Sequence, residues 1–422
     1  MRIGIDVAAA VNQRAGIGRY ARGVLGALAA RDTRDYVLGV GPRPNATAYA
    51  GPLPRFAHER RVTLPISERW LWIAWQRARL PLPPDLLAPR LDVFYNPDFL
   101  LPRLAYAPGV PTIHDLGFIT VPDCAFPKLR RHLLRAIPWS LKRARLVMAV
   151  SEHTKTDLTQ LLDVPPERVR VAGNAVDRLF RPVGDEAWRA SERARLDLPR
   201  RFVLAVGTLE PRKNLVRLLE ALALLRDRGD TVPLVVAGRE GWLYEPIYAA
   251  VERLRLGSQV RFMRGPDDHD LLALYNLADV MVYPSLYEGF GLPPLEALAC
   301  GTVVVCSNTS SLPEIVGDAA LLADPYDVDG LAMTISRAME DDELRADLTR
   351  RGPPQAQRYS WEASAASVLA ALREAAGLPS PRPSPPTPLS TAGEGSQGRP
   401  SRPTPLPCAG ERSDSSSRRV TA

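Results

Sequence analysis

The segment DVMVYPSLYEGFGLPPLEALACGTVVVCS, residues 279–307, decides the fold. It begins with an apolar run at 279–285, passes through a glycine turn and a helix-forming stretch, and ends in a second apolar run at 302–307. Apolar runs of this kind are typical of strands that helices cover on both faces. A strand, a crossover helix and another strand form a βαβ unit, so the segment predicts a parallel sheet.

The same alternation extends outward from this segment in both directions. Further apolar runs predict strands at 2–7, 36–40, 91–96, 110–115, 145–151, 168–174, 202–207, 233–238 and 259–264. Amphipathic stretches at 18–30 and 128–145 predict helices between strands. The rhythm lapses around residues 177–199 and then restarts. We therefore expect an α/β protein with two successive doubly wound domains and a cleft between them.

Length and composition agree with two ordinary soluble domains. The chain has 422 residues, of which 45% are hydrophobic and 24% charged. Its net charge of +7 includes +3 from residues 379–422, where six Arg face three acidic residues, so the rest is too weakly basic to indicate nucleic-acid binding. The four cysteines form no CxxC pair, which argues against a disulfide framework and a zinc site.

Localisation and domain limits follow from the same pattern. The N-terminus resembles a first strand rather than a signal peptide, and no apolar run approaches the ~20 residues that span a bilayer, so a cytoplasmic protein is expected. We place an N-terminal Rossmann-like domain at 1–180, a linker at 181–200, a second domain at 201–360 and an amphipathic helix at 361–377. Residues 378–422 are rich in Pro, Ser and Arg and are expected to be a disordered tail.

Glu288 and Glu296 flank the glycine turn of the central segment. Pro293 and Pro294 suit a first helical turn, which puts Glu296 in that turn and residues 289–291 in the loop above it. Backbone N–H groups of the loop can face a phosphate while the two carboxylates accept hydrogen bonds from sugar hydroxyls. Alternatively, Glu296 only favours the helix dipole and Glu288 is a solvated turn residue.

Arg212 and Lys213 follow the strand predicted at 202–207, at the mouth of a helix that begins near Asn214. Two cations and the positive end of a helix dipole at one point can bind the negative charge of a diphosphate. Only four of the 54 basic residues are lysine, which favours a need for a compact charge at Lys213. A solvated charge pair is the alternative.

Two further motifs follow expected strands, one directly at a strand end and the other farther along, just before a helix. His114 and Asp115 follow an apolar run, where open α/β sheets bind ligands; a capping histidine beside a local Asx bond of Asp115 is equally consistent. The other histidines, His153 among them, are assigned to the surface. Gly16 and Gly18, in GIGRY, let backbone N–H groups approach an anion, although an ordinary strand-to-helix turn explains them as well.

Three other features of the sequence have a simple structural explanation. The DxD-like triplets 268–270 and 327–329 precede apparent helices, so we interpret them as N-caps and predict no metal. Trp70, Trp72 and Trp75, together with the basic helix 128–145, could contact anionic lipid headgroups or a lipid-linked acceptor. Buried tryptophans and a solvated helix face explain the same residues.

Together, several motifs resemble the retaining glycosyltransferases of family four, also called group 1, and among them the bacterial mannosyltransferase-like branch. The motifs are GIGRY (16–20), TIHDL (112–116), VSEHTKTDL (150–158), VGTLEPRKN (206–214), YEGFGLPPLEALACG (287–301) and SSLPEIVGDAALLADP (310–325). The resemblance covers residues 1 to about 376 in the same order. It implies a GT-B fold, in which two Rossmann-like domains face a central cleft and the C-terminal helix crosses back to the first domain.

The resemblance also implies roles for individual residues. Glu288 would bind hydroxyls of the donor sugar, Glu296 the ribose, and His114 would line the sugar from the first domain. Arg212 and Lys213 would neutralise the diphosphate, and the backbone N–H groups that join them are those of Phe290, Gly291, Leu292, Gly16 and Gly18. Many relatives have a basic residue where this chain has Thr208, which leaves the number of cations on the phosphates open.

These roles predict retaining, metal-independent transfer of a hexosyl group from a nucleotide diphosphate sugar, with GDP-mannose as the first choice. The donor is a substrate, and no separate cofactor is expected. The acceptor would be a glycan or lipid-linked saccharide of surface polysaccharide synthesis, reached by a cytoplasmic protein with peripheral contact to the inner face of the membrane. The alternatives are a nucleotide-sugar epimerase or hydrolase of the same fold and a non-catalytic nucleotide-sugar-binding module.

Overall fold

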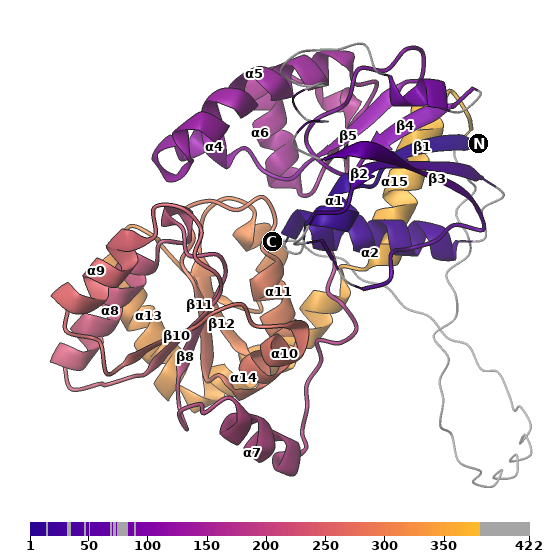
Figure 1. Ribbon diagram of the computed structural model, residues 1–422. Coiled ribbons are helices and arrows are strands. Elements are labelled where there is room, and N and C mark those ends of the chain that lie inside the picture. The colour runs from indigo at the N-terminus through magenta and orange to yellow at the C-terminus, as the bar shows by residue number, and fades with distance from the viewer. Residues whose placement is uncertain are drawn as a thin grey trace, which may run out of the picture. The chain divides into compact units, whose positions relative to one another are not determined.

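The strands form two parallel sheets, shown in the computed structural model of Figure 1. It describes residues 1–379 except positions 14–15, 32–34, 46–47, 50, 68–69, 71–72, 74–82 and 88–89. The first sheet has the order β3-β2-β1-β4-β5-β6-β7 and the second β10-β9-β8-β11-β12-β13, with parallel pairing throughout. The strands are β1 (Arg2–Asp6), β2 (Tyr36–Arg43), β3 (His58–Ser67), β4 (Val93–Asn96), β5 (Gly109–Ile113), β6 (Val147–Ala149), β7 (Val169–Val171), β8 (Val203–Val206), β9 (Leu234–Ala237), β10 (Val260–Met263), β11 (Val280–Tyr283), β12 (Val303–Ser307) and β13 (Leu321–Ala323).

Helices flank both sheets (Figure 1). The α-helices are α1 (Ala8–Asn12), α2 (Gly16–Ala30), α4 (Gly117–Thr120), α5 (Pro127–Arg143), α6 (Glu152–Leu162), α7 (Glu186–Arg195), α8 (Leu215–Asp227), α9 (Glu245–Arg253), α10 (Asp268–Leu277), α11 (Leu292–Ala299), α12 (Leu312–Val316), α13 (Val328–Glu340), α14 (Asp342–Gln357) and α15 (Trp361–Ala375). Short 3-10 helices are η2 (Pro84–Leu87), η3 (Pro122–Cys124), η4 (Pro166–Arg168) and η5 (Pro211–Lys213).

Alternate strand residues of the second sheet belong to different cores. Val203 and Ala205 pack in the core that contains α8, α9 and α13, whereas Leu204 packs in the core with α10 and α11. Because successive side chains of a strand point to opposite faces, a strand buried on both faces must be apolar throughout. This explains the continuous apolar runs and confirms the prediction of two doubly wound domains.

The last helix, α15, returns to the first sheet. It packs against α2, where the Trp361 ring lies over Gly23. Farther along the helix, Glu374 accepts two hydrogen bonds from Arg170, at 2.6 and 3.0 Å. The predicted crossing back to the first domain is therefore confirmed.

The differences from prediction lie at sheet edges and between the domains. The strands β3 and β13 were not predicted; each pairs with one neighbour only, so its sequence need not be apolar on both faces. The expected linker, residues 181–200, contains α7, whose first turn is capped by the Asp185 side chain. The predicted tail lies, from Ser380 on, outside the described residues.

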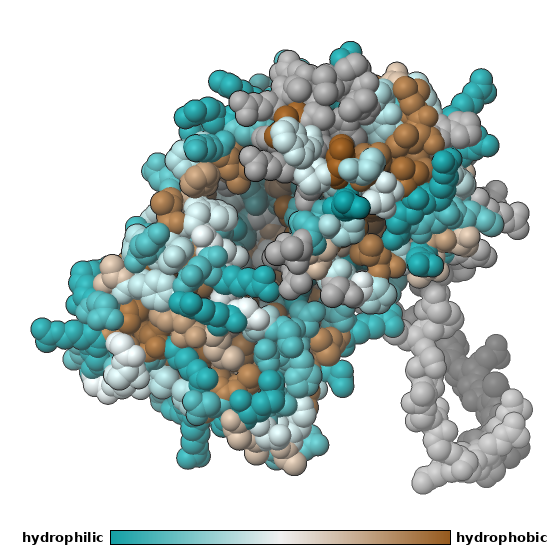
Figure 2. All heavy atoms as spheres, in the orientation of Figure 1, coloured by the Kyte–Doolittle hydropathy of each residue, from teal (hydrophilic) through white to brown (hydrophobic). Residues whose placement is uncertain are grey.

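The described residues form a mainly hydrophilic exterior on the face in view (Figure 2). On the face seen in Figure 2, hydrophilic residues predominate and hydrophobic ones are interspersed in small groups. Within the described part of the chain, no helix is both long and apolar enough to cross a bilayer.

Candidate active site

The candidate site lies where the strand order of the second sheet reverses. The neighbouring strands β8 and β11 lead to connections on opposite sides, since β9 pairs with the far edge of β8 and β12 with the far edge of β11. In open parallel sheets ligands bind beyond the carboxyl ends of such a strand pair. The chain after β8 carries Arg212 and Lys213 in η5, and the chain after β11 carries Glu288.

The Glu288 carboxylate bridges the two cations. One oxygen accepts a hydrogen bond from Lys213 Nζ at 2.6 Å, and the other lies 2.8 Å from Arg212 Nη1. Arg212 also pairs with Glu210 at 2.7 Å, and Lys213 donates to the Tyr283 hydroxyl at 2.6 Å. Glu288 is only 7% exposed. The alternatives of a solvated turn residue and a solvated charge pair are therefore wrong.

Burial and mutual attraction fix the charges of this cluster. Burial alone would raise the pKa of Glu288, but the charges of Arg212 and Lys213 lower it to about 2, so the carboxylate is ionised at neutral pH. Burial and the neighbouring Arg212 lower the pKa of Lys213. Burial also opposes the charge of Arg212, yet Glu288 and Glu210 raise its pKa well above the usual value. Two cations thus face two carboxylates at the predicted diphosphate site.

Beyond Glu288 of the cluster, the loop between β11 and α11 runs to the first residue of the helix. Gly291 is the N-cap of α11 with φ of 109°, a conformation that favours glycine. Phe290 is buried, Leu292 is the first helical residue, and Pro293 and Pro294 follow in the first turn, as predicted. Glu296 is the fifth residue of the helix, so it opens the second turn rather than lying in the first.

Glu296 is held by a residue that the sequence analysis missed. Its carboxylate is 3% exposed and accepts hydrogen bonds from the Tyr275 hydroxyl, at 2.9 Å, and from the guanidinium of Arg19. Burial raises the pKa of Glu296, an effect that Arg19 opposes. The alternative, in which Glu296 only favours the helix dipole, does not account for a buried carboxylate that accepts two hydrogen bonds. Arg19 is the charged residue of the GIGRY motif, which was the available signal.

The first sheet brings His114 next to the glycine loop. The His114 ring is buried between Tyr20 and Phe99, and its Nε2 donates to the Pro97 carbonyl at 2.9 Å. Burial lowers its pKa, so the ring is neutral. Asp115 makes the local Asx bond, accepting from the Gly117 N–H at 3.0 Å, while the histidine side chain caps no helix.

The two glycines of GIGRY have different surroundings. Gly16 is exposed and is the first residue of α2. Gly18 is buried, and a Cβ there would lie 1.8 Å from the Gln13 carbonyl oxygen. Gly18 is therefore required for close packing of the helix start. The predicted contact of Gly16 and Gly18 with a donor phosphate remains a prediction.

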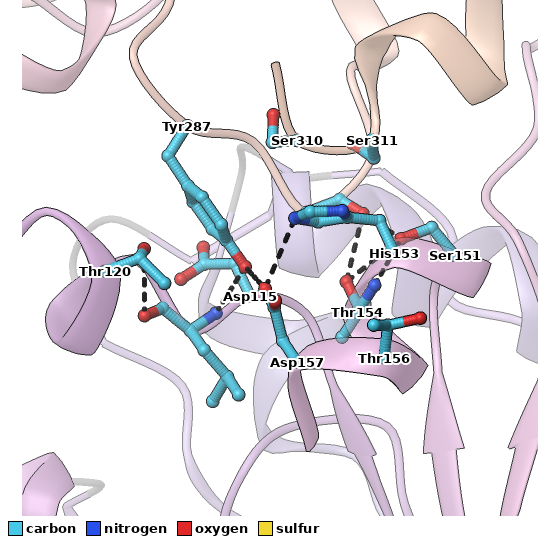
Figure 3. A network of polar contacts seen from close by, with 12 residues as sticks. Asp115, Thr120, Ser151, His153, Thr154, Thr156, Asp157, Tyr287, Ser310 and Ser311 are labelled. Atoms are coloured by element: carbon cyan, nitrogen blue, oxygen red, sulfur yellow. Dashed lines mark hydrogen bonds and ion pairs between the residues drawn. The ribbon is translucent and has the colours of Figure 1, made fainter. Parts of the chain in front are cut away.

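Figure 3 shows a polar network that joins α6 to the loop before α11. The Tyr287 hydroxyl donates to Asp157 at 2.5 Å and accepts from the Leu116 N–H at 3.2 Å. His153 Nε2 lies 3.4 Å from the same carboxylate, and its side chain is 32% exposed, so this residue lies at the surface as predicted and also takes part in the network. The α6 side chains of the network belong to VSEHTKTDL, a family motif for which no role of an individual side chain was predicted.

Hydroxyl groups hold the same loop from both sides. Ser151 and Thr154 of the first domain donate to the Gly289 carbonyl at 2.7 and 3.2 Å. On the other side the Glu288 N–H donates to Ser310 at 2.9 Å, and Ser311 Oγ lies 3.0 Å from the Glu288 carbonyl oxygen. The backbone around Glu288 is thereby fixed by both halves of the chain.

Both halves of the chain match families of known proteins. Residues 14–178 match the model described as Glycosyltransferase Family 4, and residues 186–354 match Glycosyl transferases group 1. The O-antigen chain mannosyltransferase B of Escherichia coli is 39% identical over 274 residues, which are 64% of this chain and 71% of that protein. The chain belongs to the group 1 glycosyltransferases of family four. The enzyme is thus a glycosyltransferase, and the resemblance of its motifs is confirmed.

Other relatives show how far the likeness extends. The serotype-specific mannosyltransferase WbdA of Escherichia coli is 34% identical over 224 residues, which cover 52% of this chain but only 28% of that protein. Among solved structures, sucrose-phosphate synthase from Thermosynechococcus elongatus matches with a TM-score of 0.72 and 23% identity, covering 89% of this chain and 98% of that one. At this identity the match concerns the fold alone, and it confirms the GT-B prediction.

The acidic triplets of the glycosyltransferase lie at helix starts. The Asp267 and Asp270 side chains form a capping box at α10, and the Asp327 side chain caps α13. The interpretation as an N-cap is confirmed for Asp327, whereas the N-cap of α10 is Asp267, one residue before the triplet 268–270. Among the residues described, no group of three or more His, Cys, Asp or Glu side chains is arranged to hold a metal ion.

Proposed function

We propose that the enzyme transfers a mannosyl group from GDP-mannose to a growing surface polysaccharide or a lipid-linked saccharide, with retention at the anomeric carbon. The relative with 39% identity is named an O-antigen chain mannosyltransferase, which supports both the sugar and the kind of acceptor. The observation that carries the proposal is the buried cluster of Arg212, Lys213 and Glu288 beyond the strands β8 and β11.

The cluster suits the charge changes of glycosyl transfer. Breaking the bond between sugar and diphosphate builds negative charge on the leaving phosphate and positive charge on the anomeric carbon. Arg212, Lys213 and the N-terminus of α11 can stabilise the phosphate charge without reorganisation, because the protein already holds them in place. Glu288 is ionised and can accept hydrogen bonds from sugar hydroxyls while it keeps both cations in position.

Retention and metal independence follow from the same arrangement in our proposal. The acceptor hydroxyl would attack on the face that the diphosphate leaves, and a phosphate oxygen would take its proton. Both oxygens of Glu288 are engaged by Arg212 and Lys213, so we assign this carboxylate to binding rather than to nucleophilic attack. The cations would stabilise the charge that develops on the leaving phosphate, as a divalent metal does in other transferases.

A donor panel tests the proposal. Purified enzyme is incubated with GDP-mannose, UDP-glucose and other nucleotide sugars, with and without lipid-linked acceptors, and products are resolved by mass spectrometry. We expect mannosylated acceptor with GDP-mannose. A clean epimer or free sugar in the absence of acceptor would favour the epimerase or hydrolase, and tight donor binding with zero turnover would favour a binding module. An absence of both transfer and donor hydrolysis would remove support for the proposal.

We further propose that the enzyme docks peripherally on an anionic membrane through α5 and the turn before it. The apolar side chains Phe126, Leu129 and Leu134 are 45%, 47% and 38% exposed. Exposed basic residues surround them, and residues 125–151 contain no Asp or Glu. Trp70 is 62% exposed, so the alternative of a buried tryptophan is wrong for it, whereas Trp72 and Trp75 lie outside the described residues.

Sedimentation with vesicles tests the docking. Binding to phosphatidylglycerol vesicles and not to phosphatidylcholine vesicles is expected, because each basic residue near an anionic surface contributes about 1 kcal/mol. Reversal of Lys128, Arg131 and Arg135 to Glu should abolish binding. Reversal of the exposed residues Arg178, Arg200 and Arg255 is the matched control. Equal binding by both triple variants would contradict the assignment to α5.

A further inference from the structure

Arg19 of the first domain lies between two carboxylates of the second. It is in the first turn of α2, and its side chain is 24% exposed. Nη1 donates to Glu296 in α11, and Nη2 donates to Asp268, the first residue of α10. The guanidinium also lies 5.7 Å from the centre of the buried Phe180 ring. Arg19 is therefore directed at the carboxylate that we expect to hold the donor ribose.

The two ion pairs of Arg19 differ in their surroundings. The Glu296 side chain is 4% exposed and is also held by Tyr275, so removal of its partner would leave a buried charge incompletely compensated. The Asp268 side chain is 63% exposed, and exposed pairs contribute only about 0–1 kcal/mol. The Nη2 edge of Arg19 can therefore exchange Asp268 for another anion at little cost, while the Nη1 edge stays on Glu296.

The charge balance of the site leaves a role for such a cation. Arg212 and Lys213 are matched by Glu210 and Glu288, so the cluster itself is close to neutral. A nucleoside diphosphate brings at least two negative charges. The other arginine near the start of α2, Arg22, is engaged elsewhere, since it donates to the Ala10 and Gln13 carbonyls and lies 4.0 Å from the Tyr49 ring centre.

We infer that Arg19 is a donor-binding residue, which releases Asp268 and pairs with the diphosphate while it keeps Glu296 oriented toward the ribose. The inference rests on the proposed function, because it takes a nucleotide diphosphate sugar as the ligand. It assigns a third cation to the phosphates. This cation would compensate for Thr208, which stands where many relatives have a basic residue. Asp268 then competes with the donor for Arg19.

The competition predicts effects of opposite sign, which a purely structural contact between the domains does not. Replacement of Arg19 by Gln should weaken the binding of GDP and raise the donor KM at least about tenfold, as expected for a lost charge-assisted hydrogen bond. Replacement by Lys should restore part of the loss. Replacement of Asp268 by Asn should strengthen GDP binding by about two- to fivefold, since it removes the exposed competitor.

Titration calorimetry with GDP and UDP, together with donor KM and kcat, tests the inference on the full chain. The matched control is Asp329→Asn, because Asp329 also lies in a first helical turn and forms an exposed pair, 3.0 Å from Arg228. Circular dichroism checks that each variant is folded. If Arg19→Gln does not fold, the binding of GDP by Asp268→Asn still tests the inference.

Four outcomes are distinguishable. Weaker binding by Arg19→Gln and tighter binding by Asp268→Asn supports the inference. Weaker binding by both variants, with a similar fall in Tm, shows a structural pair and overturns it, as does unchanged binding in both. If the wild-type enzyme neither binds a nucleotide nor turns over any donor, the proposed function fails, and the inference fails with it.

Discussion

Lys213 occupies a place that suits lysine better than arginine. Its ammonium group contacts both Glu288 and the Tyr283 hydroxyl, and its aliphatic chain lies against Gly207, 3.3 Å from a Cβ built there. A compact charge on a slim chain fits this narrow space, whereas a planar guanidinium requires more room. The structure thus gives a physical reason for one of the four lysines in an arginine-rich chain.

Replacement of Lys213 by Ala should reduce the transfer rate at least about 100-fold, as expected for the loss of one preorganised charge at the leaving group. The control is Lys155→Ala, which removes another of the four lysines from an exposed pair, 3.6 Å from Glu152. Initial rates at saturating donor measure the effect. Near-normal activity of the Lys213 variant would remove this residue from the site.

Glu288 should make the stability of the enzyme depend on pH. Its pKa is lowered from 4.5 to about 2, so its contribution is present above pH 4.5 and is lost as the pH falls through 2. The shift corresponds to roughly 3 kcal/mol at neutral pH. Denaturant unfolding should show Glu288→Gln destabilised by this order, with the difference from wild type shrinking below pH 4.5.

A difference between wild type and Glu288→Gln that stays constant down to the acid transition would contradict this charge assignment. Protonation of the other acidic groups lowers the free energy of unfolding of both proteins alike, so its effect cancels in the comparison.

At the scale of elements, the loop between β11 and α11 is the part of the site that both domains position. Ser151 and Thr154 hold the Gly289 carbonyl, Ser310 holds the Glu288 N–H, and Tyr287 reaches Asp157. Glycine is required at 289 because a Cβ would lie 1.7 Å from the His114 carbonyl oxygen. The loop can therefore reach this position only if no side chain separates it from the end of β5.

Replacement of Gly289 by Ala should displace Glu288 and reduce transfer by about 100-fold, because a shift of ~1 Å at reacting groups can have that effect. Thermal unfolding should show a lower Tm as well. Gly257→Ala is the control, since no atom lies within 4 Å of a Cβ built there. Unchanged kinetics of Gly289→Ala would show that the two segments separate during the reaction.

At the scale of the whole molecule, α15 is the last helix of the described residues, and it packs on the first sheet. Its contacts with α2 and Arg170 end before Leu378, and the stretch after it is rich in Pro, Ser and Arg. Such a composition offers little apolar surface to bury against a folded domain. The folded part of the enzyme therefore does not depend on residues 380–422 in our prediction.

Deletion of residues 380–422 should leave the transfer rate and Tm unchanged. The matched variant ends at Ser360 and so lacks α15; it should lose stability because Trp361 and the buried residues Val368 and Leu372 are removed from the core. Activity assays and calorimetric unfolding on both truncations measure this. A large loss of activity on removing residues 380–422 alone would assign a function to the tail.

The sequence by itself determined the two parallel sheets, because strands buried on both faces must be apolar throughout and therefore appear as uninterrupted runs. It also singled out Arg212, Lys213, Glu288 and Glu296 as candidate site residues, since ligands of this fold class bind beyond the strand ends. It missed β3 and β13. Each of these is an edge strand that pairs with one neighbour only, so its residues need not all be apolar and no continuous apolar run marks it.

Only the tertiary structure decided what these residues touch. The contact of Arg19 with Glu296 joins positions 277 residues apart, and that of Tyr287 with Asp157 joins positions 130 apart. No local periodicity encodes such pairs, because they depend on how two domains meet rather than on the propensity of either segment. The glutamates predicted as hydroxyl-binding groups are also the anchors of Arg212, Lys213 and Arg19, because a buried carboxylate requires a cationic partner.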